Sequence, residues 1–212
     1  MEKYISKKEK ASYGFAAVGS YMVAGITQSY LMYFFTDILI IPSAFVMMLM
    51  IVARVWDALN DPMMGVIVDR TSTKYGKMRP YVLIGSFLML VTTIVLFMPL
   101  TGAPTMFKMI FAAVSYIIFG MAYTLTDVPA MGLMSVATPS SDERASLLSF
   151  YVTVGSVGSL LPVGLLTIFQ SFIPEKYVYF AMSIFVGIIT SAAYLTLFKN
   201  SKERFSTHTE KI

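Results

Sequence analysis

The chain alternates long apolar stretches with short connectors that carry prolines or charges. About 20 apolar residues in a helix are enough to cross the hydrocarbon core of a bilayer. Because backbone groups in lipid must find their hydrogen bonds within the protein, such stretches are expected to be α-helices. The pattern predicts six membrane-spanning helices, at residues 13–36, 45–68, 81–100, 106–136, 147–170 and 178–198. Polar segments flank this six-helix domain at 1–12 and 199–212, and we expect the second to be a disordered tail.

The basic residues indicate which way the helices run. Six spans place both termini on one side of the membrane, together with the loops at 69–80 and 137–146. Of the 16 Lys and Arg residues, only Lys108 and Lys176 fall on the opposite side, and Arg54 falls within a span. Because basic residues are enriched in cytoplasmic loops, we expect a multi-pass plasma-membrane protein with both termini in the cytoplasm. The polar, basic first ten residues do not resemble a cleavable signal peptide.

Composition supports the membrane class and argues against several others. Hydrophobic residues make up 57% of the chain and charged residues only 13%, against about 25% charged residues in soluble domains. The basic residues behind the net charge of +4 are concentrated in the loops and termini on one side of the membrane. The charge therefore indicates topology rather than nucleic-acid binding. There is no cysteine for a disulfide or a thiolate metal site, and the only histidine, His208, lies in the polar tail without ligand partners.

Charged residues inside the second span are the strongest sign of function. Each acid or base costs roughly 2.5–3.5 kcal/mol at the centre of a membrane helix, and Arg54, Asp57 and Asp61 all fall here. At about 100° per residue the three lie within about 60° of one another, with Asn60 beside them. A buried pair of Arg54 with one aspartate would serve only helix packing, and it leaves the second carboxylate and the amide unexplained. Carboxylate and amide oxygens suit Na⁺, or a proton in its place, so we predict a cation site with Asp57 and Asp61 as its charged ligands.

The fourth span carries a second polar cluster at a similar depth. The same argument of cost makes Asp127 a candidate functional residue. Thr124 and Thr126 allow two interpretations, because membrane threonines often bond back to their own helix. On the fifth span, the small residues within 155–159 predict a helix-packing face. No histidine or suitably placed nucleophile accompanies the acids within the spans, so we expect neither an enzyme nor a cofactor.

These motifs resemble a known family. Gly65–Arg70 followed by Lys74–Pro80 is similar to the loop between the second and third helices of the major facilitator superfamily. Together with the stretch RVWDALNDP at 54–62, it resembles the glycoside–pentoside–hexuronide:cation symporters, the family of the bacterial melibiose carrier. Tyr30–Asp37 and Tyr123–Pro129 fit the same family, and the resemblance extends over essentially the whole chain.

The resemblance implies a cation site and a conformational latch. Family members bind the coupling cation, which is Na⁺ or H⁺ with Li⁺ also possible, at positions that here are Asp57, Asn60, Asp61 and Thr124. In this interpretation charged residues after the second helix hold one conformation through ion pairs, and here they are Asp69, Arg70 and Arg79.

The resemblance implies a sugar site that matches less fully. Asp127 and Tyr123 match the family pattern, and Arg54 and Tyr21 are the other implied substrate contacts. Three positions depart from that pattern: the first-helix acid falls on Gly19-Ser20-Tyr21, the fourth-helix aromatic on Met131, and the fifth-helix basic residue near Val152. A different substrate, or a degenerate site, would fit these departures.

The resemblance also implies the fold and the function. We expect an all-α integral membrane protein whose six transmembrane helices form one half, a 3+3 inverted repeat, of a major facilitator fold. Family members have about twelve spans, so this chain resembles the N-terminal half. The implied function is cation-coupled symport of a sugar or glycoside across the plasma membrane, with the lipid bilayer, a monovalent cation and a second six-helix half or homodimer as partners. The alternative is a non-transporting half or a truncated fragment that needs a partner half.

Overall fold

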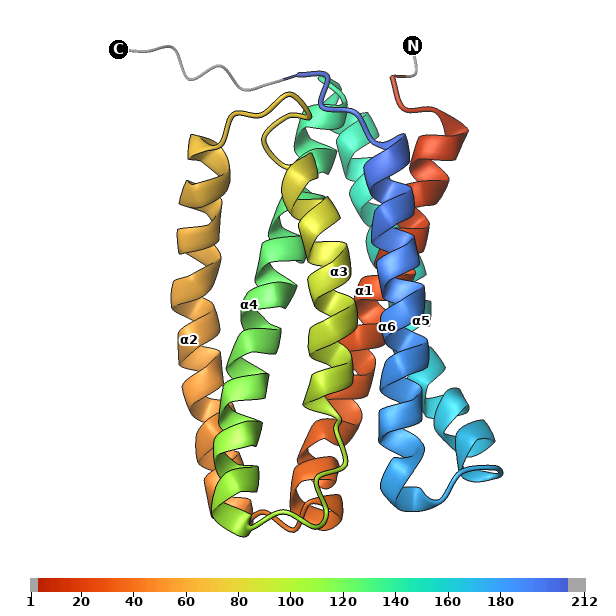
Figure 1. The fold of residues 1–212 in the computed structure, drawn as a ribbon. Coiled ribbons are helices and arrows are strands. Elements are labelled where there is room, and N and C mark those ends of the chain that lie inside the picture. Colours follow the sequence, from red (N-terminus) through yellow and green to blue (C-terminus); the bar gives the residue numbers. More distant parts are fainter. Residues whose placement is uncertain (1–3, 206–212) are drawn as a thin grey trace.

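The computed structural model describes residues 4–205, and over that range the chain is a bundle of six long helices without a β-strand (Figure 1). The helices are α1 (Lys7–Tyr33), which continues into a short π-helix η1 (Phe34–Ile38), then α2 (Ser43–Arg70), α3 (Arg79–Leu96), α4 (Thr105–Ala137), α5 (Ser141–Gln170) and α6 (Glu175–Asn200). Each predicted span falls on one helix, the first of them continuing into η1. The predicted all-α fold is therefore confirmed.

Helix ends differ from the predicted spans where capping or proline decides them. α1 begins at Lys7, within the predicted N-terminal segment, because the Ser6 hydroxyl accepts a hydrogen bond from the backbone N–H of Glu9 (3.1 Å). α3 ends at Leu96, before the predicted span does. Pro99 follows closely, and a proline disfavours helical backbone at the residue before it.

Successive helices run in opposite directions, so α1 begins and α6 ends at the same end of the bundle, here called the terminal face (Figure 1). The terminal face carries residues 71–78, 138–140 and 201–205, and the opposite face carries 39–42, 97–104 and 171–174. Five of the helices, α2 to α6, are long and apolar enough to cross a membrane. The chain is therefore a multi-pass membrane protein.

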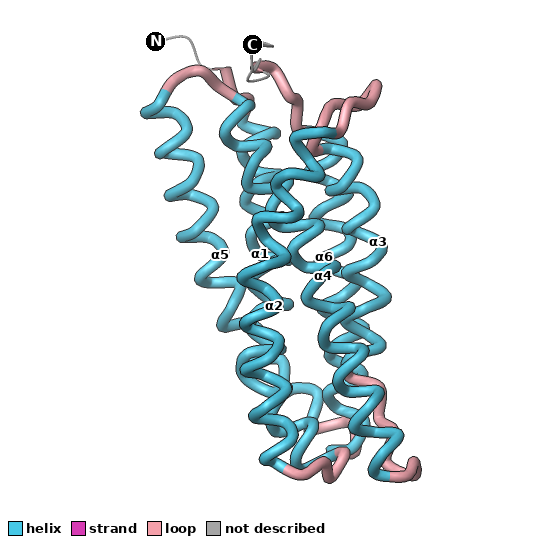
Figure 2. Tube along the Cα trace, turned by 90° about the vertical axis from the view of Figure 1, so that its left-hand side faces the viewer, coloured by secondary structure: helices cyan, strands magenta, loops and turns pink. Residues whose placement is uncertain are grey.

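Composition sets α1 apart from the other five helices. It opens on the charged turn Lys7–Lys10 and carries many small and polar residues, including the buried Ser12 and Ser20. α1 packs against both α5 and α6, so much of its surface meets protein rather than lipid (Figure 2). Small and polar residues suit such contacts between membrane helices.

The most extensive contacts between helices repeat when the two halves of the bundle are exchanged. α1 packs against α5 and α6, and α4 packs against α2 and α3. Exchanging α1 with α4, α2 with α5, and α3 with α6 converts the first set into the second, and it maps the contact between α3 and α6 onto itself. Since α1 and α4 run in opposite directions, this is an inverted 3+3 repeat, as predicted.

Glycines allow α1 and α5 to approach closely. A Cβ atom on Gly158 would lie 2.9 Å from the backbone of Val18, and one on Gly25 would lie 2.6 Å from the carbonyl oxygen of Ser159. Both distances are shorter than a side chain allows, so these positions need glycine. The small-residue packing face predicted within 155–159 is therefore confirmed at Gly155 and Gly158, whereas Ser156 is exposed.

The segment after α6 lies against the bundle, which corrects the prediction of a disordered tail. α6 continues to Asn200, and residues 201–205, here called the clasp, cross the terminal face. Arg204 forms an ion pair with the buried Glu9 of α1 (Nη2 to Oε2, 2.8 Å), the only ion pair within the described part of the chain. The remainder of the predicted tail, with His208, lies outside the described residues.

The clasp also caps the start of α3. The Glu203 carboxylate accepts hydrogen bonds from the backbone N–H groups of Lys77 (2.8 Å), Met78 (2.9 Å) and Arg79 (3.0 Å). N–H groups at a helix start have no partner within the helix, and the helix dipole favours an anion there. Gly76, with a φ of 106°, supplies the left-handed backbone of this turn and leaves room for the carboxylate.

A buried lysine caps the C-terminal end of η1 on the opposite face. Lys108 of α4 is 6% exposed, and its Nζ donates to the carbonyl oxygen of Leu39 (2.8 Å). A cation is favoured at the C-terminal end of a helix. One of the two basic residues predicted on this side of the membrane is therefore held within the fold.

Candidate functional site

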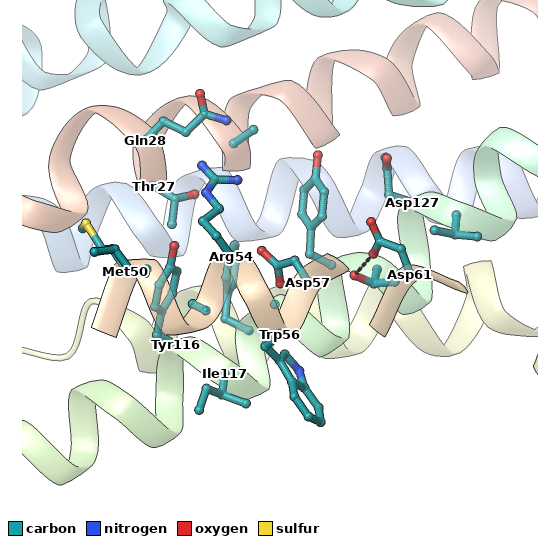
Figure 3. Close-up of a pocket in the computed structure, with 18 residues that line it drawn as sticks. Thr27, Gln28, Met50, Arg54, Trp56, Asp57, Asp61, Tyr116, Ile117 and Asp127 are labelled. Carbon is teal, nitrogen blue, oxygen red and sulfur yellow. Dashed lines mark hydrogen bonds between the residues drawn. The ribbon is translucent and has the colours of Figure 1, made fainter. Parts of the chain in front are cut away.

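A cavity of about 620 Å³ opens between α1, α2 and α4. Six of the predicted site residues line it (Figure 3): Arg54, Asp57, Asp61, Tyr123, Thr124 and Asp127. The two polar clusters recognised on separate spans therefore share one cavity.

A hydrogen bond across two helices builds the candidate cation site. Thr124 of α4 is 5% exposed, and its Oγ1 donates to Oδ1 of Asp61 on α2 (2.8 Å). Thr126 instead donates to the carbonyl oxygen of Ala122 in its own helix (2.7 Å). The structure thus separates the two threonines whose roles the sequence left open: Thr124 faces the acids, and Thr126 bonds back to its helix.

Asp57 lies about one helical turn from Asp61 and faces a gap in α4. A Cβ atom on Gly120 would lie 3.1 Å from Oδ1 of Asp57, so glycine leaves space there for the carboxylate. Two carboxylates and a hydroxyl are oxygen ligands of the kind that Na⁺ accepts. Among residues 4–205 no cluster of three or more acidic, His or Cys side chains is placed to hold a metal ion.

Arg54 forms no ion pair with either aspartate in the described structure. Its side chain extends from α2 toward α1, in the direction of Gln28 (Figure 3). A pair of Arg54 with one aspartate that serves only helix packing is therefore absent from the described structure. The two carboxylates keep their oxygen atoms available on the cavity wall.

Hydroxyl groups from three other helices hold Asp127. Its Oδ1 accepts hydrogen bonds from Ser20 of α1 (2.8 Å), Tyr194 of α6 (3.2 Å) and Tyr151 of α5 (3.5 Å). Ser20 also shares a hydrogen bond with the hydroxyl of Tyr123 (3.1 Å). All three donors are essentially buried. They fix the carboxylate while its Oδ2 remains without a hydrogen-bond partner among residues 4–205.

Sequence reasoning missed Ser20, Tyr151 and Tyr194 as partners of Asp127. Single serines and tyrosines are common in membrane helices, so nothing in their spacing distinguishes these three. They meet only because α1, α5 and α6 pack around α4.

Two predicted site residues lie away from the cavity. Tyr21 packs edge-on against Tyr151, with ring centroids 6.2 Å apart, and its ring covers Gly155. The side-chain nitrogen of Asn60 is buried and has no hydrogen-bond partner among the described residues. Their roles in substrate and cation binding stay predictions.

The predicted latch residues form no ion pairs in this conformation. Asp69 and Arg70 are exposed in the last turn of α2. Arg79 donates from Nη2 to the carbonyl oxygen of Phe198 (2.7 Å). Its guanidinium lies 4.8 Å from the centre of the Phe198 ring. The acid that holds this loop is Glu203 of the clasp, and the latch stays a prediction.

Comparison with known proteins finds transporters. Residues 12–211 match the family model described as MFS/sugar transport protein. The chain is 34% identical over 208 residues to the uncharacterized symporter YjmB of Bacillus subtilis. The matched region covers 96% of this chain and 45% of that protein. It is 34% identical over 161 residues to the inner membrane symporter YicJ of Escherichia coli, covering 74% of this chain and 34% of the relative. It is 28% identical over 204 residues to the isoprimeverose transporter of Lactiplantibacillus pentosus, and the matched region covers 94% of this chain and 42% of that transporter. The chain therefore spans less than half the length of these relatives.

Proposed function

Because the chain belongs to the MFS sugar transport family, we propose that it carries the N-terminal half of a secondary active transporter, which couples entry of a sugar or glycoside to a cation. The observation that carries the proposal is the hydrogen bond between Thr124 and Asp61 on the wall of a cavity that also holds Asp57 and Asp127. This arrangement supports a cation site that lies next to polar groups for a sugar.

The coupling follows from the geometry of α4. Thr124 belongs to the cation site, while Tyr123 and Asp127 lie within one turn of it on the same helix. Without a cation, the carboxylates of Asp57 and Asp61 repel each other. A bound Na⁺, or a proton in its place, removes that repulsion and holds both carboxylates beside Thr124. This sets Tyr123 and Asp127 for the sugar, and the loaded cavity then opens to the other side.

The orientation and the partner are parts of the same proposal. The terminal face is cytoplasmic, because the basic residues gather there, and the membrane is the plasma membrane. Arg54 and Asp61 are exposed on the side of the bundle, where contact with lipid would cost roughly 2.5–3.5 kcal/mol each. A second six-helix half, from another chain or from a second copy of this one, covers them.

Paired threonine variants test the cation site. In membrane vesicles that hold the chain with its partner half, uptake of a panel of radiolabelled sugars and glycosides is measured against Na⁺, Li⁺ and proton concentration. Thr124→Val should raise the half-saturating cation concentration about tenfold, because a hydrogen bond to a charged group contributes about 1.5–3 kcal/mol. Thr126→Val, two residues away, should leave it unchanged, since that hydroxyl serves its own helix.

Two results would overturn the proposal. One is uptake that none of the three cations accelerates. The other is an equal response of the Thr124 and Thr126 variants. No uptake of any sugar, with the chain present in the membrane in normal amount, would favour the alternative of a non-transporting half.

A further inference from the structure

A group of basic and aromatic side chains lies at the terminal face, where α3 begins and α6 ends. Tyr75, in the turn before α3, packs edge-on against Phe198 of α6, with ring centroids 6.1 Å apart. The Nζ of Lys74 lies 5.1 Å from the centre of the Tyr75 ring, and the guanidinium of Arg79 lies 4.8 Å from the centre of the Phe198 ring. Lys199 follows Phe198 in the last turn of α6. These five residues are here called the basic corner.

The positive charge of the basic corner is not balanced by the acid beside it. The only ion pair within residues 4–205 joins the clasp to α1, so Lys74, Arg79 and Lys199 have none there. Glu203 of the clasp contacts the start of α3, but its carboxylate accepts from three backbone N–H groups rather than from a basic side chain. Lys74 and Lys199 are exposed. Three cations beside one carboxylate leave the basic corner positively charged.

The outer surface of α3 and α6 is apolar and separate from the cavity. On α3, Ile84, Phe87 and Val91 are exposed at spacings of three and four residues, which places them on one face of the helix. On α6, Phe185 and Ile188 are exposed at a spacing of three. The two helices pack side by side (Figure 1), and the cavity is lined by α1, α2 and α4 instead. In a membrane protein such a surface suits contact with lipid tails.

Helix geometry places the basic corner at the edge of the hydrocarbon core. Ile188 lies at the middle of α6, and Lys199 follows it by eleven residues. At about 100° per residue the two fall about 20° apart around the helix, and at 1.5 Å per residue they lie about 16 Å apart along it. The hydrocarbon core extends about 15 Å from its centre. Lys199 therefore continues the exposed apolar face of α6 to the depth of the lipid headgroups, where tyrosine is also enriched.

We propose that the basic corner binds the headgroup of an anionic phospholipid, whose acyl chains lie along the exposed apolar residues of α3 and α6. Ammonium and guanidinium groups donate strong hydrogen bonds to phosphate oxygens, and basic residues at the membrane surface attract anionic lipids. The rings of Tyr75 and Phe198 hold Lys74 and Arg79 in place through cation–π contacts. Such a site needs neither a sugar nor a coupling cation, so it stands apart from the proposed transport function.

The test measures lipid binding to the purified chain in detergent by native mass spectrometry. Phosphatidylglycerol is compared with phosphatidylcholine that carries the same acyl chains, and it should bind at least about tenfold more tightly. Lys74→Gln combined with Lys199→Gln should weaken phosphatidylglycerol binding about 25-fold, or about fivefold for each cation removed. Lys74→Arg combined with Lys199→Arg keeps the charge and should keep the binding.

A matched pair of lysines distinguishes a built site from general surface charge. Lys7 and Lys10 lie three residues apart at the start of α1, and Lys10 lies 4.9 Å from the centre of the Phe150 ring on α5, away from α3. Lys7→Gln combined with Lys10→Gln removes the same charge from the same face and should leave phosphatidylglycerol binding unchanged. An equal loss of binding in the two glutamine pairs, or equal binding of the two lipids by the unmodified chain, would overturn the site.

Discussion

At the scale of the residue, two buried tyrosines show what the network around Asp127 contributes. Tyr194 is 1% exposed and donates to Oδ1 of Asp127, whereas Tyr13 is fully buried and its hydroxyl has no partner among residues 4–205. Both rings pack in the same part of the core. A hydroxyl bonded to a carboxylate contributes free energy, and a buried hydroxyl without a partner costs it. Loss of the two hydroxyls should therefore have different effects.

We predict that Tyr194→Phe weakens sugar binding about tenfold, or about 1.4 kcal/mol, because Asp127 loses one of the donors that position it. Tyr13→Phe should leave sugar binding unchanged and should not lower the unfolding temperature. Half-saturation of uptake and thermal unfolding in detergent measure the two effects. Equal losses of affinity in both variants would show that the Asp127 network does not position the acid.

The charged part of the site could be predicted from sequence, and its hydroxyl partners could not. Asp57, Asp61 and Asp127 stand out because a charge in a membrane helix needs a reason. Ser20 and Tyr194 carry no charge, and their partner depends on how α1 and α6 pack around α4. For the same reason, the separate roles of the two α4 threonines needed the structure.

At the scale of the element, the start of α3 depends on a distant residue. No local side chain caps this helix, and the Glu203 carboxylate accepts its first N–H groups from across the terminal face. The six spans could be predicted from apolar length alone. The clasp could not, because a short charged segment after a helix has the composition of a free tail.

We predict that Glu203→Ala destabilises the terminal face by about 1–3 kcal/mol, the cost of leaving partly buried donors unsatisfied. Amide hydrogen exchange should rise at Lys77, Met78 and Arg79, and the unfolding temperature in detergent should fall. Asp142→Asn, an exposed acid that opens α5, is the matched control and should change neither. Unchanged exchange at the start of α3 in Glu203→Ala would contradict the capping role.

At the scale of the whole molecule, the position of the cavity follows from the inverted repeat. α1 and α4 hold equivalent places in the repeat, and both contribute to the cavity. Substrate sites in such transporters lie where repeats meet near the middle of the membrane. We therefore propose that the acids on α2 act in transport once a second half closes the cavity over them.

The most direct test of the central claim measures cation movement driven by a sugar. Proteoliposomes that hold the chain with its partner half receive a transported sugar on one side only, and entry of ²²Na⁺, Li⁺ or protons is followed. The sugar should accelerate entry of one of these cations, and Asp61→Asn should abolish that acceleration while Asp142→Asn preserves it. Sugar entry without any accompanying cation, or cation entry undiminished in Asp61→Asn, would contradict the account.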